Sequence, residues 1–446
     1  MPRVLVVTYQ WLPMFNAGVK FVANLCRYLP AAGWEPHILT KDWSDGAAVE
    51  DAPLAMSVQP IDASPSLKNA ATLPVVRAPY ALRDNRWLRR HARLNEHETN
   101  NPLSPDAWMR RALDVAYPLH GHYPDMQRGW VEPAVKAGLT AVRQYGIGAV
   151  VTVCPPASSV IVGGEIARGA GIPWVTLFAD LSAFHDAPHW TQRAMAKRWL
   201  HSASRAASVS PRMAEYVKET FGVGGDVVVY PFDPEERKVA PHRSPGAPMR
   251  LVHTGSINPA SQQPQLLFDA LDELVRDDAA LLDQITVELV GSRNDEWLHS
   301  MLAGRPCAPA VQVLDRVPPA DAVSMQREAD VLLTFNRQGD ELGYPRQMFE
   351  HWNAGRPTIA VGADAGGFVT SLLAESEAGE VADDAPGLAN ILRRYLGELH
   401  DAGLIAFRGD AVVIARHGAP EQAKRLGALL DAASAERYGS WQRARR

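Results

Sequence analysis

Short apolar runs alternate with amphipathic segments along most of this 446-residue chain, and this alternation constrains the fold more than any other feature. The first example is RVLVVTY (3–9), then a segment with Phe21, Leu25 and Leu29 at helical spacing, then EPHILT (35–40). Uninterrupted apolar strands beside amphipathic helices are typical of a parallel sheet covered on both faces. The pattern therefore predicts an α/β fold built from βαβ units.

The alternation continues in two blocks separated by a charged stretch rich in proline and glycine, PEERKVAPHRSPGAP (234–248). Further predicted strands are 149–153, 172–180, 207–210 and 227–231 in the first block, and 249–255, 285–291, 311–315, 329–335 and 357–361 in the second. The predicted helices between them are 158–169, 212–220, 264–275, 296–303 and 319–328. Because the chain is longer than one hydrophobic core usually serves, we expect two Rossmann-like domains that face each other across a cleft.

The expected domain boundaries follow from this pattern. They are an N-terminal domain over 1–235 with a partly irregular insertion at 41–128, a linker at 236–248, a second domain over 249–420, and a C-terminal helix with a basic tail at 421–446. The insertion contains the basic segment RDNRWLRRHAR (83–93), which we interpret first as a solvated surface. The alternative is peripheral contact of 83–93 with an anionic membrane surface.

Composition and charge exclude several classes of protein. The net charge of −5 gives no general attraction to nucleic acid, so no nucleic-acid partner is expected. Three scattered cysteines fit reduced thiols and predict a cytoplasmic location. If residues 83–93 contact a membrane, the protein would lie peripherally at its inner face. His120 and His122 lack a third ligand residue, so no metal site is predicted. The oligomeric state is left open.

In open α/β sheets, ligands bind beyond the carboxyl ends of the strands. The loop at 10–18 leads into a helix at Gly18, where a ligand can approach backbone amides. The stretch GYPRQMFEHWNAGRPTIAV (343–361) places Glu350 about one turn into a short helix. A carboxylate there complements the helix dipole or accepts hydrogen bonds from a vicinal diol such as a ribose. The chain contains neither a GxGxxG fingerprint nor a GxxxxGK[ST] phosphate loop.

The stretch LGYPRQMFEHWNAGRPTIAVGADAGG (342–367) resembles the nucleotide-sugar signature of GT-B glycosyltransferases, in particular the retaining family-4-like group. Segments in the same order along most of the chain are similar to that family as well, among them VTVCPPASSVIVGGEIARGAGIPWVTLFAD, ASVSPRMAEYVKETFG and LVHTGSINP. The insertion at 41–128 matches least. The resemblance implies a GT-B fold in which the C-terminal helix returns to the N-terminal, acceptor-side domain, while the second domain binds the donor.

The resemblance also implies an activity and a set of site residues. It implies transfer of a sugar from a nucleotide-diphosphate donor, most simply a UDP-sugar, to a sugar, lipid-linked or small-molecule acceptor, with no cofactor and no metal, in polysaccharide, glycolipid or natural-product glycosylation. The donor would contact Gly18, Gly255, Ser256, Gly291, Tyr344, Pro345, Gln347 and Glu350, with Glu350 on the ribose. Asp180 and His185 would face the acceptor, and Arg346 would supply positive charge during catalysis.

The sequence departs from the family at positions that matter for catalysis. The loop SINPASQQPQ (256–265) has no Arg or Lys, and Gln347 stands where the signature has Lys. A departing diphosphate needs fixed cations, and Arg346, Lys20 and Arg337 are the nearest candidates in the sequence. Two alternatives therefore stay open: a non-catalytic nucleotide-sugar-binding or scaffold relative, and a GT-B nucleotide-sugar epimerase.

Overall fold

A computed structural model of the chain provides the coordinates. It describes residues 1–14, 16–43, 64–80, 125, 127–181, 198–237, 246–291, 295–336, 346–363 and 367–444, with side chains as far as 436 in the last of these ranges. The chain forms two compact units, one made of residues 1–230 together with 419–446 and the other of residues 231–418.

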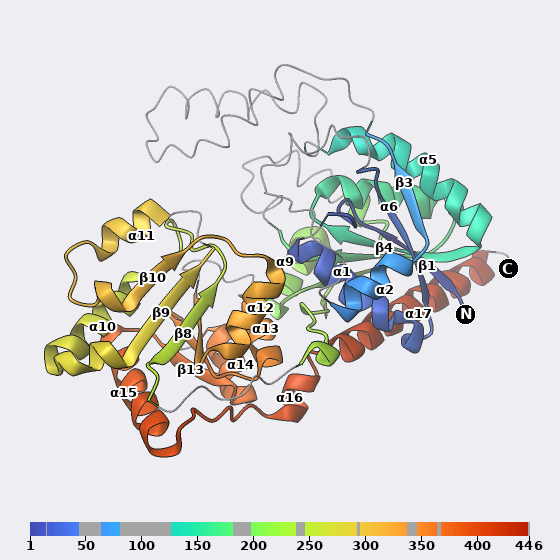
Figure 1. Cartoon of the computed structure of the whole chain (residues 1–446). Helices are drawn as coiled ribbons and strands as arrows, with labels where there is room; N and C mark the ends of the chain where they lie inside the picture. The colour runs from blue at the N-terminus through green and yellow to red at the C-terminus, as the bar shows by residue number, and fades with distance from the viewer. Residues whose placement is uncertain are drawn as a thin grey trace. The chain divides into compact units, whose positions relative to one another are not determined.

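Unit 1 contains a seven-stranded parallel sheet in the order β3-β2-β1-β4-β5-β6-β7 (Figure 1). Its strands are β1 (Arg3–Val7), β2 (Glu35–Lys41), β3 (Val75–Ala78), β4 (Ile147–Cys154), β5 (Trp174–Phe178), β6 (Arg205–Ser208) and β7 (Asp226–Val227). Its helices are α1 (Ala17–Tyr28), the 3-10 turn η1 (Leu29–Ala32), α2 (Pro65–Thr72), α5 (Arg128–Tyr145), α6 (Ala157–Ala170), α9 (Pro211–Phe221) and α17 (Ala419–Ala444). The apolar runs predicted as strands form the central strands because both of their faces are covered.

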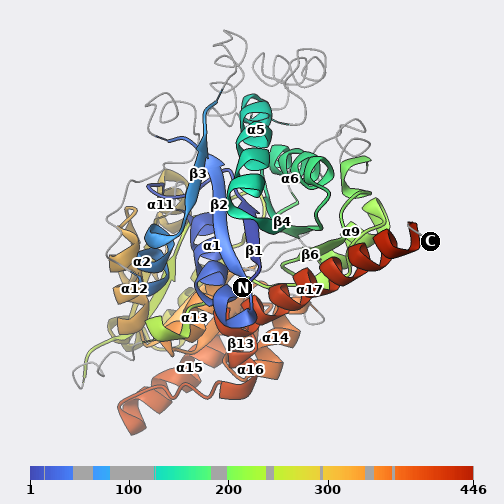
Figure 2. The same cartoon turned by 90° about the vertical axis from the view of Figure 1, so that its right-hand side faces the viewer.

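The helices of unit 1 lie on both faces of this sheet (Figures 1 and 2). Helices α1 and α2 pack together on one face, and α5 and α6 pack together on the other. The two pairs lie on opposite faces because the connections between strands are right-handed crossovers, and the sheet grows from β1 in opposite directions, toward β2 on one side and toward β4 on the other. The C-terminal helix α17 runs along η1 and α1. The Trp34 indole donates to Asp431 Oδ1 (3.0 Å), and Leu426 and Leu430 are buried. The expected return of the C-terminal helix to the N-terminal domain is confirmed.

Unit 2 contains a six-stranded parallel sheet in the order β10-β9-β8-β11-β12-β13. Its strands are β8 (Met249–Thr254), β9 (Ile285–Val290), β10 (Val311–Leu314), β11 (Val331–Phe335), β12 (Thr358–Val361) and β13 (Gly379–Ala382). Its helices are α10 (Gln265–Asp277), α11 (Asp295–Leu302), α12 (Pro319–Glu328), α13 (Gln347–Ala354), α14 (Phe368–Ser376), α15 (Ala385–Ala402) and α16 (Ala411–Ala415), with 3-10 turns η4 (Pro234–Glu236), η5 (Ala279–Gln284) and η6 (Ala308–Ala310). This strand order is that of the Rossmann fold, in agreement with the predicted Rossmann-like domain.

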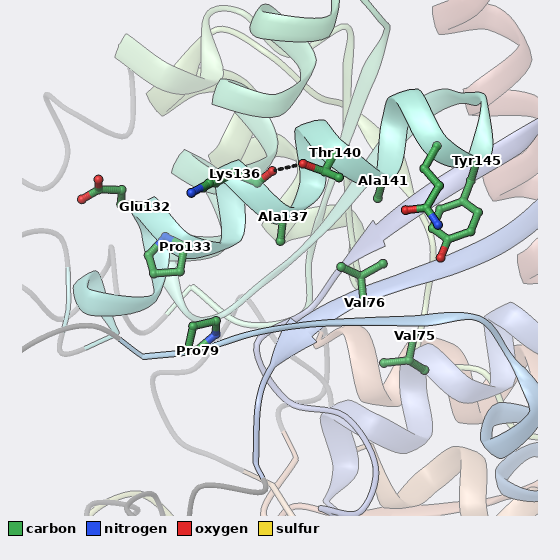
Figure 3. Close-up of a pocket in the computed structure, with 11 residues that line it drawn as sticks. Val75, Val76, Pro79, Glu132, Pro133, Lys136, Ala137, Thr140, Ala141 and Tyr145 are labelled. Atoms are coloured by element: carbon green, nitrogen blue, oxygen red, sulfur yellow. Dashed lines mark hydrogen bonds between the residues drawn. The ribbon is translucent and has the colours of Figure 1, made fainter.

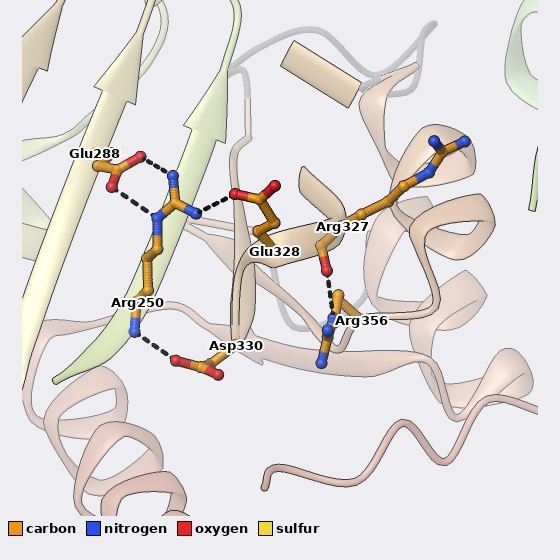
Figure 4. A network of polar contacts seen from close by, with 6 residues as sticks. All are labelled: Arg250, Glu288, Arg327, Glu328, Asp330 and Arg356. Atoms are coloured by element: carbon orange, nitrogen blue, oxygen red, sulfur yellow. Dashed lines mark hydrogen bonds and ion pairs between the residues drawn. The ribbon is translucent and has the colours of Figure 1, made fainter. Parts of the chain in front are cut away.

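A polar network in unit 2 joins the start of β8 to the middle of β9 and to the start of β11 (Figure 4). The Arg250 guanidinium on β8 binds both carboxylate oxygens of Glu288 on β9, each at 2.7 Å, and lies 3.4 Å from Glu328. Its backbone amide donates to Asp330 Oδ2 (2.8 Å) just before β11. Because Arg250 and Glu288 are both largely buried, this bidentate pair fixes the register of β8 against β9.

Two parts of unit 1 differ from the sequence-based expectation. The segment 227–231 was predicted as a full strand, but β7 ends at Val227. The Val228 amide still donates to the Ser208 carbonyl of β6 (3.0 Å), whereas the Val229 amide donates to Gln422 Oε1 (2.9 Å) on α17, so the chain leaves the sheet there. The segment 41–128, predicted as partly irregular, contributes β3 and α2 to the sheet and its cover. Residues 83–93, His120 and His122 lie outside the described residues.

Candidate functional site

The strand order of unit 2 places its topological switch point between β8 and β11. The helix after β8 lies on one face of the sheet and the helix after β11 on the other, the arrangement in which open α/β sheets bind ligands at the carboxyl edge between the two strands. Gly255 and Ser256 follow β8, and Arg346 and Gln347 stand at the start of α13 beyond β11. This edge of the sheet therefore carries several of the donor-binding residues that the sequence predicted in this unit.

Gly255 and Gln347 are in direct contact at this point. Gln347 Nε2 donates to the Thr254 carbonyl (2.8 Å), and a Cβ added at Gly255 would lie 2.3 Å from the same nitrogen. Gly255 also has φ +132°, a backbone conformation that side-chain-bearing residues rarely adopt. Gln347 therefore occupies the space above Gly255 and ties the first turn of α13 to the end of β8.

The neighbouring strand β9 is followed directly by Gly291, which has φ +84°. Ser256 Oγ lies 3.4 Å from the Gly291 carbonyl oxygen, and Arg316, just after β10, packs its Cγ 3.9 Å from the position of a Cβ on Gly291. Arg316 is exposed, and in the described part of the chain its guanidinium makes no hydrogen bond or ion pair. The sequence analysis missed Arg316, although it is the first basic residue after the predicted strand 311–315.

The first turn of α13 carries Arg346 and Glu350. Arg346 Nε lies 3.8 Å from Glu350 Oε1, an ion pair too long to be a hydrogen bond, and the Glu350 side chain is 27% exposed. The first amides of a helix have no partner inside the helix and form its positive end. An anion and a hydroxyl pair can thus be bound one turn apart, by these amides and by Glu350. Tyr344, Pro345 and Arg337 lie outside the described residues.

Buried polar side chains make hydrogen bonds to the last residues of β8 and β11. Gln326 Nε2 donates to Thr254 Oγ1 (2.7 Å), and Gln262 Nε2 donates to the Phe335 carbonyl (2.7 Å). His253 Nδ1 lies 3.0 Å from the Leu333 carbonyl oxygen and is fully buried, and burial lowers the pKa of its imidazole to about 4. His253 is therefore neutral near pH 7 and serves as a packing and hydrogen-bonding group.

In unit 1 the corresponding switch point lies between β1 and β4. Asn16 caps α1, its Oδ1 accepting from the Val19 amide (3.0 Å), and its Nδ2 donates to Gln10 Oε1 (2.6 Å). A Cβ at Gly18 would lie 3.3 Å from Asn16 Oδ1. Gly18 therefore leaves room for this capping arrangement, and Lys20 lies one residue beyond Val19 on α1.

Near the ends of β4 and β5, Asp180 is exposed and follows β5, while His185 lies outside the described residues. Asp125 was not predicted from the sequence; it is half-buried and accepts hydrogen bonds from the Ser158 amide (2.8 Å) and the Ser158 hydroxyl at the start of α6. Burial raises the pKa of the Asp125 carboxyl, an effect opposed by these hydrogen bonds. A local sequence pattern carries no signal for this contact because its partners are 33 positions apart.

Among the described residues, no group of three or more His, Cys, Asp or Glu side chains is placed to hold a metal ion. The same residues include no helix that is both long and apolar enough to cross a membrane.

Comparisons with known proteins identify the fold. No protein-family model and no curated protein sequence matches the chain. Among solved structures, Alr3699/HepE from Anabaena in complex with UDP has TM-score 0.60 and 14% identity over 97% of this chain and 100% of that chain. The lipopolysaccharide outer core galactosyltransferase WaaB, in its apo form, has TM-score 0.54 and 13% identity over 97% and 99%. The N-terminal domain of trehalose-6-phosphate phosphatase from Candida albicans has TM-score 0.57 and 10% identity over 97% and 99%.

At these identities the similarity establishes the fold alone. The chain has the α/β architecture predicted from its sequence, two Rossmann-like units with parallel sheets, as in the GT-B glycosyltransferases. Because one fold hosts many activities, the function has to be argued from the site.

Proposed function

We propose that the protein is a glycosyltransferase that moves a sugar from a nucleotide-diphosphate donor to an acceptor hydroxyl. The observation that carries this proposal is the β8/β11 switch point, where Gly255, the first turn of α13 and the Glu350 carboxylate lie at one edge of the sheet. The fold is shared with HepE, whose structure contains UDP, and with the galactosyltransferase WaaB, which supports the same donor class.

Each part of a nucleotide sugar has a proposed partner in unit 2. The first amides of α13 and the Ser256 hydroxyl would bind the diphosphate, with Tyr344 and Pro345 shaping the loop before the helix. Glu350 would accept hydrogen bonds from both ribose hydroxyls. Arg316 extends the proposed site toward β10, beside Gly291, and its planar guanidinium suits a phosphate or the face of a base.

The proposed chemistry follows from what the donor must lose. The bond from the sugar's anomeric carbon to the diphosphate oxygen breaks, and a bond from the acceptor oxygen forms on the same face of the sugar. The acceptor proton passes to the departing phosphate oxygen, so the products are a glycoside and a nucleoside diphosphate. Arg346 would offset the charge that develops on the diphosphate, and Asp180 and His185 would orient the acceptor. We propose neither metal nor cofactor for this step.

The finer parts of the proposal rest on the sequence resemblance. They are a UDP-sugar as donor, retention of configuration, Gly18 beside the diphosphate, and a sugar, lipid-linked or small-molecule acceptor in polysaccharide, glycolipid or natural-product glycosylation. A cytoplasmic location, with 83–93 at the inner membrane face, belongs to the same set.

A non-catalytic nucleotide-sugar-binding role is the second candidate, and one observation favours it. Gln347 occupies the position of the family's lysine and donates its side-chain amide to Thr254 instead of offering a cation. Such a protein would bind a donor without transferring its sugar.

A donor panel separates the two candidates. UDP-, GDP- and TDP-sugars are added to the full chain, and thermal stabilisation and nucleoside diphosphate release are measured in parallel. The proposed transferase is stabilised by at least one donor and releases nucleoside diphosphate from it when acceptors are supplied. Stabilisation without release across the panel would establish the binding role, and the lack of both would remove each candidate.

A further inference from the structure

A groove of about 700 Å³ lies in unit 1 between the edge strand β3 and helix α5, and none of its lining residues belongs to the proposed donor site (Figure 3). It is lined on one side by Val75, Val76 and Pro79 and on the other by one flank of α5. In Figure 3, Val76 and Ala137 face the space between the strand and the helix. The groove therefore follows the edge of the sheet.

The flank of α5 presents two parallel rows of side chains at helical spacing. The inner row is Pro133, Ala137, Ala141 and Tyr145, and the outer row is Glu132, Lys136, Thr140 and Gln144. The inner row is buried or half-buried and the outer row is exposed. From Glu132 to Tyr145 the helix rises about 20 Å, which is roughly the length of six residues in an extended strand. The groove thus has an apolar floor and a polar rim that fit an elongated ligand.

The edge strand adds a requirement that distinguishes between ligands. The Ile38 amide donates to the Pro74 carbonyl (2.8 Å) and the Asp42 amide to the Ala78 carbonyl (2.8 Å), so the even-numbered residues of β3 pair with β2. Because backbone groups alternate in direction along a strand, the N–H and C=O groups of Val75 and Arg77 point to the outer edge. No strand among the described residues pairs with that edge.

We propose that this groove binds an extended peptide segment of a partner protein, which adds to β3 as a further strand. A polypeptide backbone supplies alternating donors and acceptors at the spacing that Val75 and Arg77 present, whereas a lipid or sugar chain does not. Lys136 lies on the exposed rim of the groove, where its ammonium group complements an acidic side chain on the incoming strand. The partner segment therefore carries apolar residues at alternate positions, with one acidic residue in the same row.

The experiment uses the full chain and a fluorescein-labelled eight-residue peptide of alternating threonine and valine, with one valine replaced by aspartate. Binding is followed by fluorescence anisotropy. We expect saturable binding that Ala137→Arg, which fills the floor of the groove, weakens at least tenfold. Lys136→Glu weakens it several-fold, and a peptide with lysine in place of aspartate recovers the loss. Arg143→Glu, an exposed charge reversal on α5 outside the groove, serves as the matched control and leaves binding unchanged.

Three outcomes would overturn the proposal. The first is no binding to the wild-type chain. The second is equal binding of a peptide N-methylated along one edge, which cannot pair with a strand, because the groove would then be an apolar site of another kind. The third is concentration-dependent dimerisation that Ala137→Arg abolishes while the peptide does not compete, because the groove would then hold a second copy of this chain. Circular dichroism of each variant verifies that the chain is folded.

Discussion

Gly255 is the residue of the proposed donor site at which the backbone leaves the least room for a side chain. Its φ of +132° and the 2.3 Å approach of Gln347 Nε2 both oppose a Cβ. We expect Gly255→Ala to lower the free energy of unfolding by about 1–3 kcal/mol, because alanine is strained at this φ. We also expect weaker nucleotide binding, because the Gln347 side chain must give up its hydrogen bond to Thr254. Urea unfolding and calorimetry measure the two effects.

A matched control separates backbone strain from the clash at Gly255. Gly225 has φ +111°, and a Cβ added there would meet only Lys218 Cδ at 3.6 Å, an ordinary contact, so Gly225→Ala tests strain without a clash. Adding Gln347→Ala to Gly255→Ala removes the clash and should recover part of the loss. Equal costs for Gly255→Ala and Gly225→Ala, with no recovery in the double variant, would show that the contact with Gln347 is unimportant.

Two fully buried histidines of unit 2, His253 and His351, predict a dependence of stability on pH. Burial lowers the pKa of His253 to about 4 and that of His351 to about 3, compared with an ordinary value of 6.5. Between these values the unfolded chain binds more protons than the folded chain, so the free energy of unfolding falls as the pH is lowered from 6.5 toward 4. Each histidine contributes at most about 1.4 kcal/mol per pH unit within that window.

Chemical denaturation between pH 7.5 and 4.5 measures this slope. His351→Leu removes one of the two titrating groups, and we expect a shallower decline than in the wild-type chain. An identical decline in the variant would mean that His351 is protonated equally in the folded and unfolded chains.

Between elements, the Arg250–Glu288 pair joins the start of β8 to the middle of β9, and neither residue belongs to the proposed site. Arg250→Ala would leave the largely buried Glu288 carboxylate without its bidentate partner. We expect a loss of about 3 kcal/mol in the free energy of unfolding, because an unpaired buried charge is costly. Thermal or urea unfolding of the variant measures the change.

The exposed pair Arg416–Glu375 provides the control, since its side chains are 54% and 57% accessible. Arg416→Ala should cost less than about 1 kcal/mol. If the two variants lose the same stability, Arg250 does not fix the register of these strands.

For the fold as a whole, the central strands and their order along the chain could be predicted from the sequence. The runs at 149–153 and 285–291 are covered on both faces and therefore read as continuous apolar segments. The edge strands β3 and β13 are short and half exposed, and the sequence analysis did not identify them. Their pairing depends on neighbours in the sheet and leaves little local pattern.

The candidate site was predictable to a similar extent. Gly255, Ser256, Gly291, Gln347 and Glu350 follow predicted strands or begin a predicted helix, so their positions at the carboxyl edge of the sheet could be expected. The contact of Gln347 with Thr254 joins residues 93 positions apart, and the packing of Arg316 on Gly291 depends on the pairing of β9 with β10. These contacts follow from the sheet register, which a local motif does not record.

In the proposed function, unit 2 binds a nucleotide sugar with Glu350 on the ribose. Calorimetric titration of the full chain with UDP, and with the donor that the panel selects, measures this binding. Glu350→Ala should weaken binding roughly 10- to 100-fold, since hydrogen bonds to a charged group contribute about 1.5–3 kcal/mol. Asp283→Ala, which removes an exposed carboxylate just before β9 at the opposite edge of the sheet, should bind like the wild-type chain. Unchanged affinity in Glu350→Ala would contradict the account.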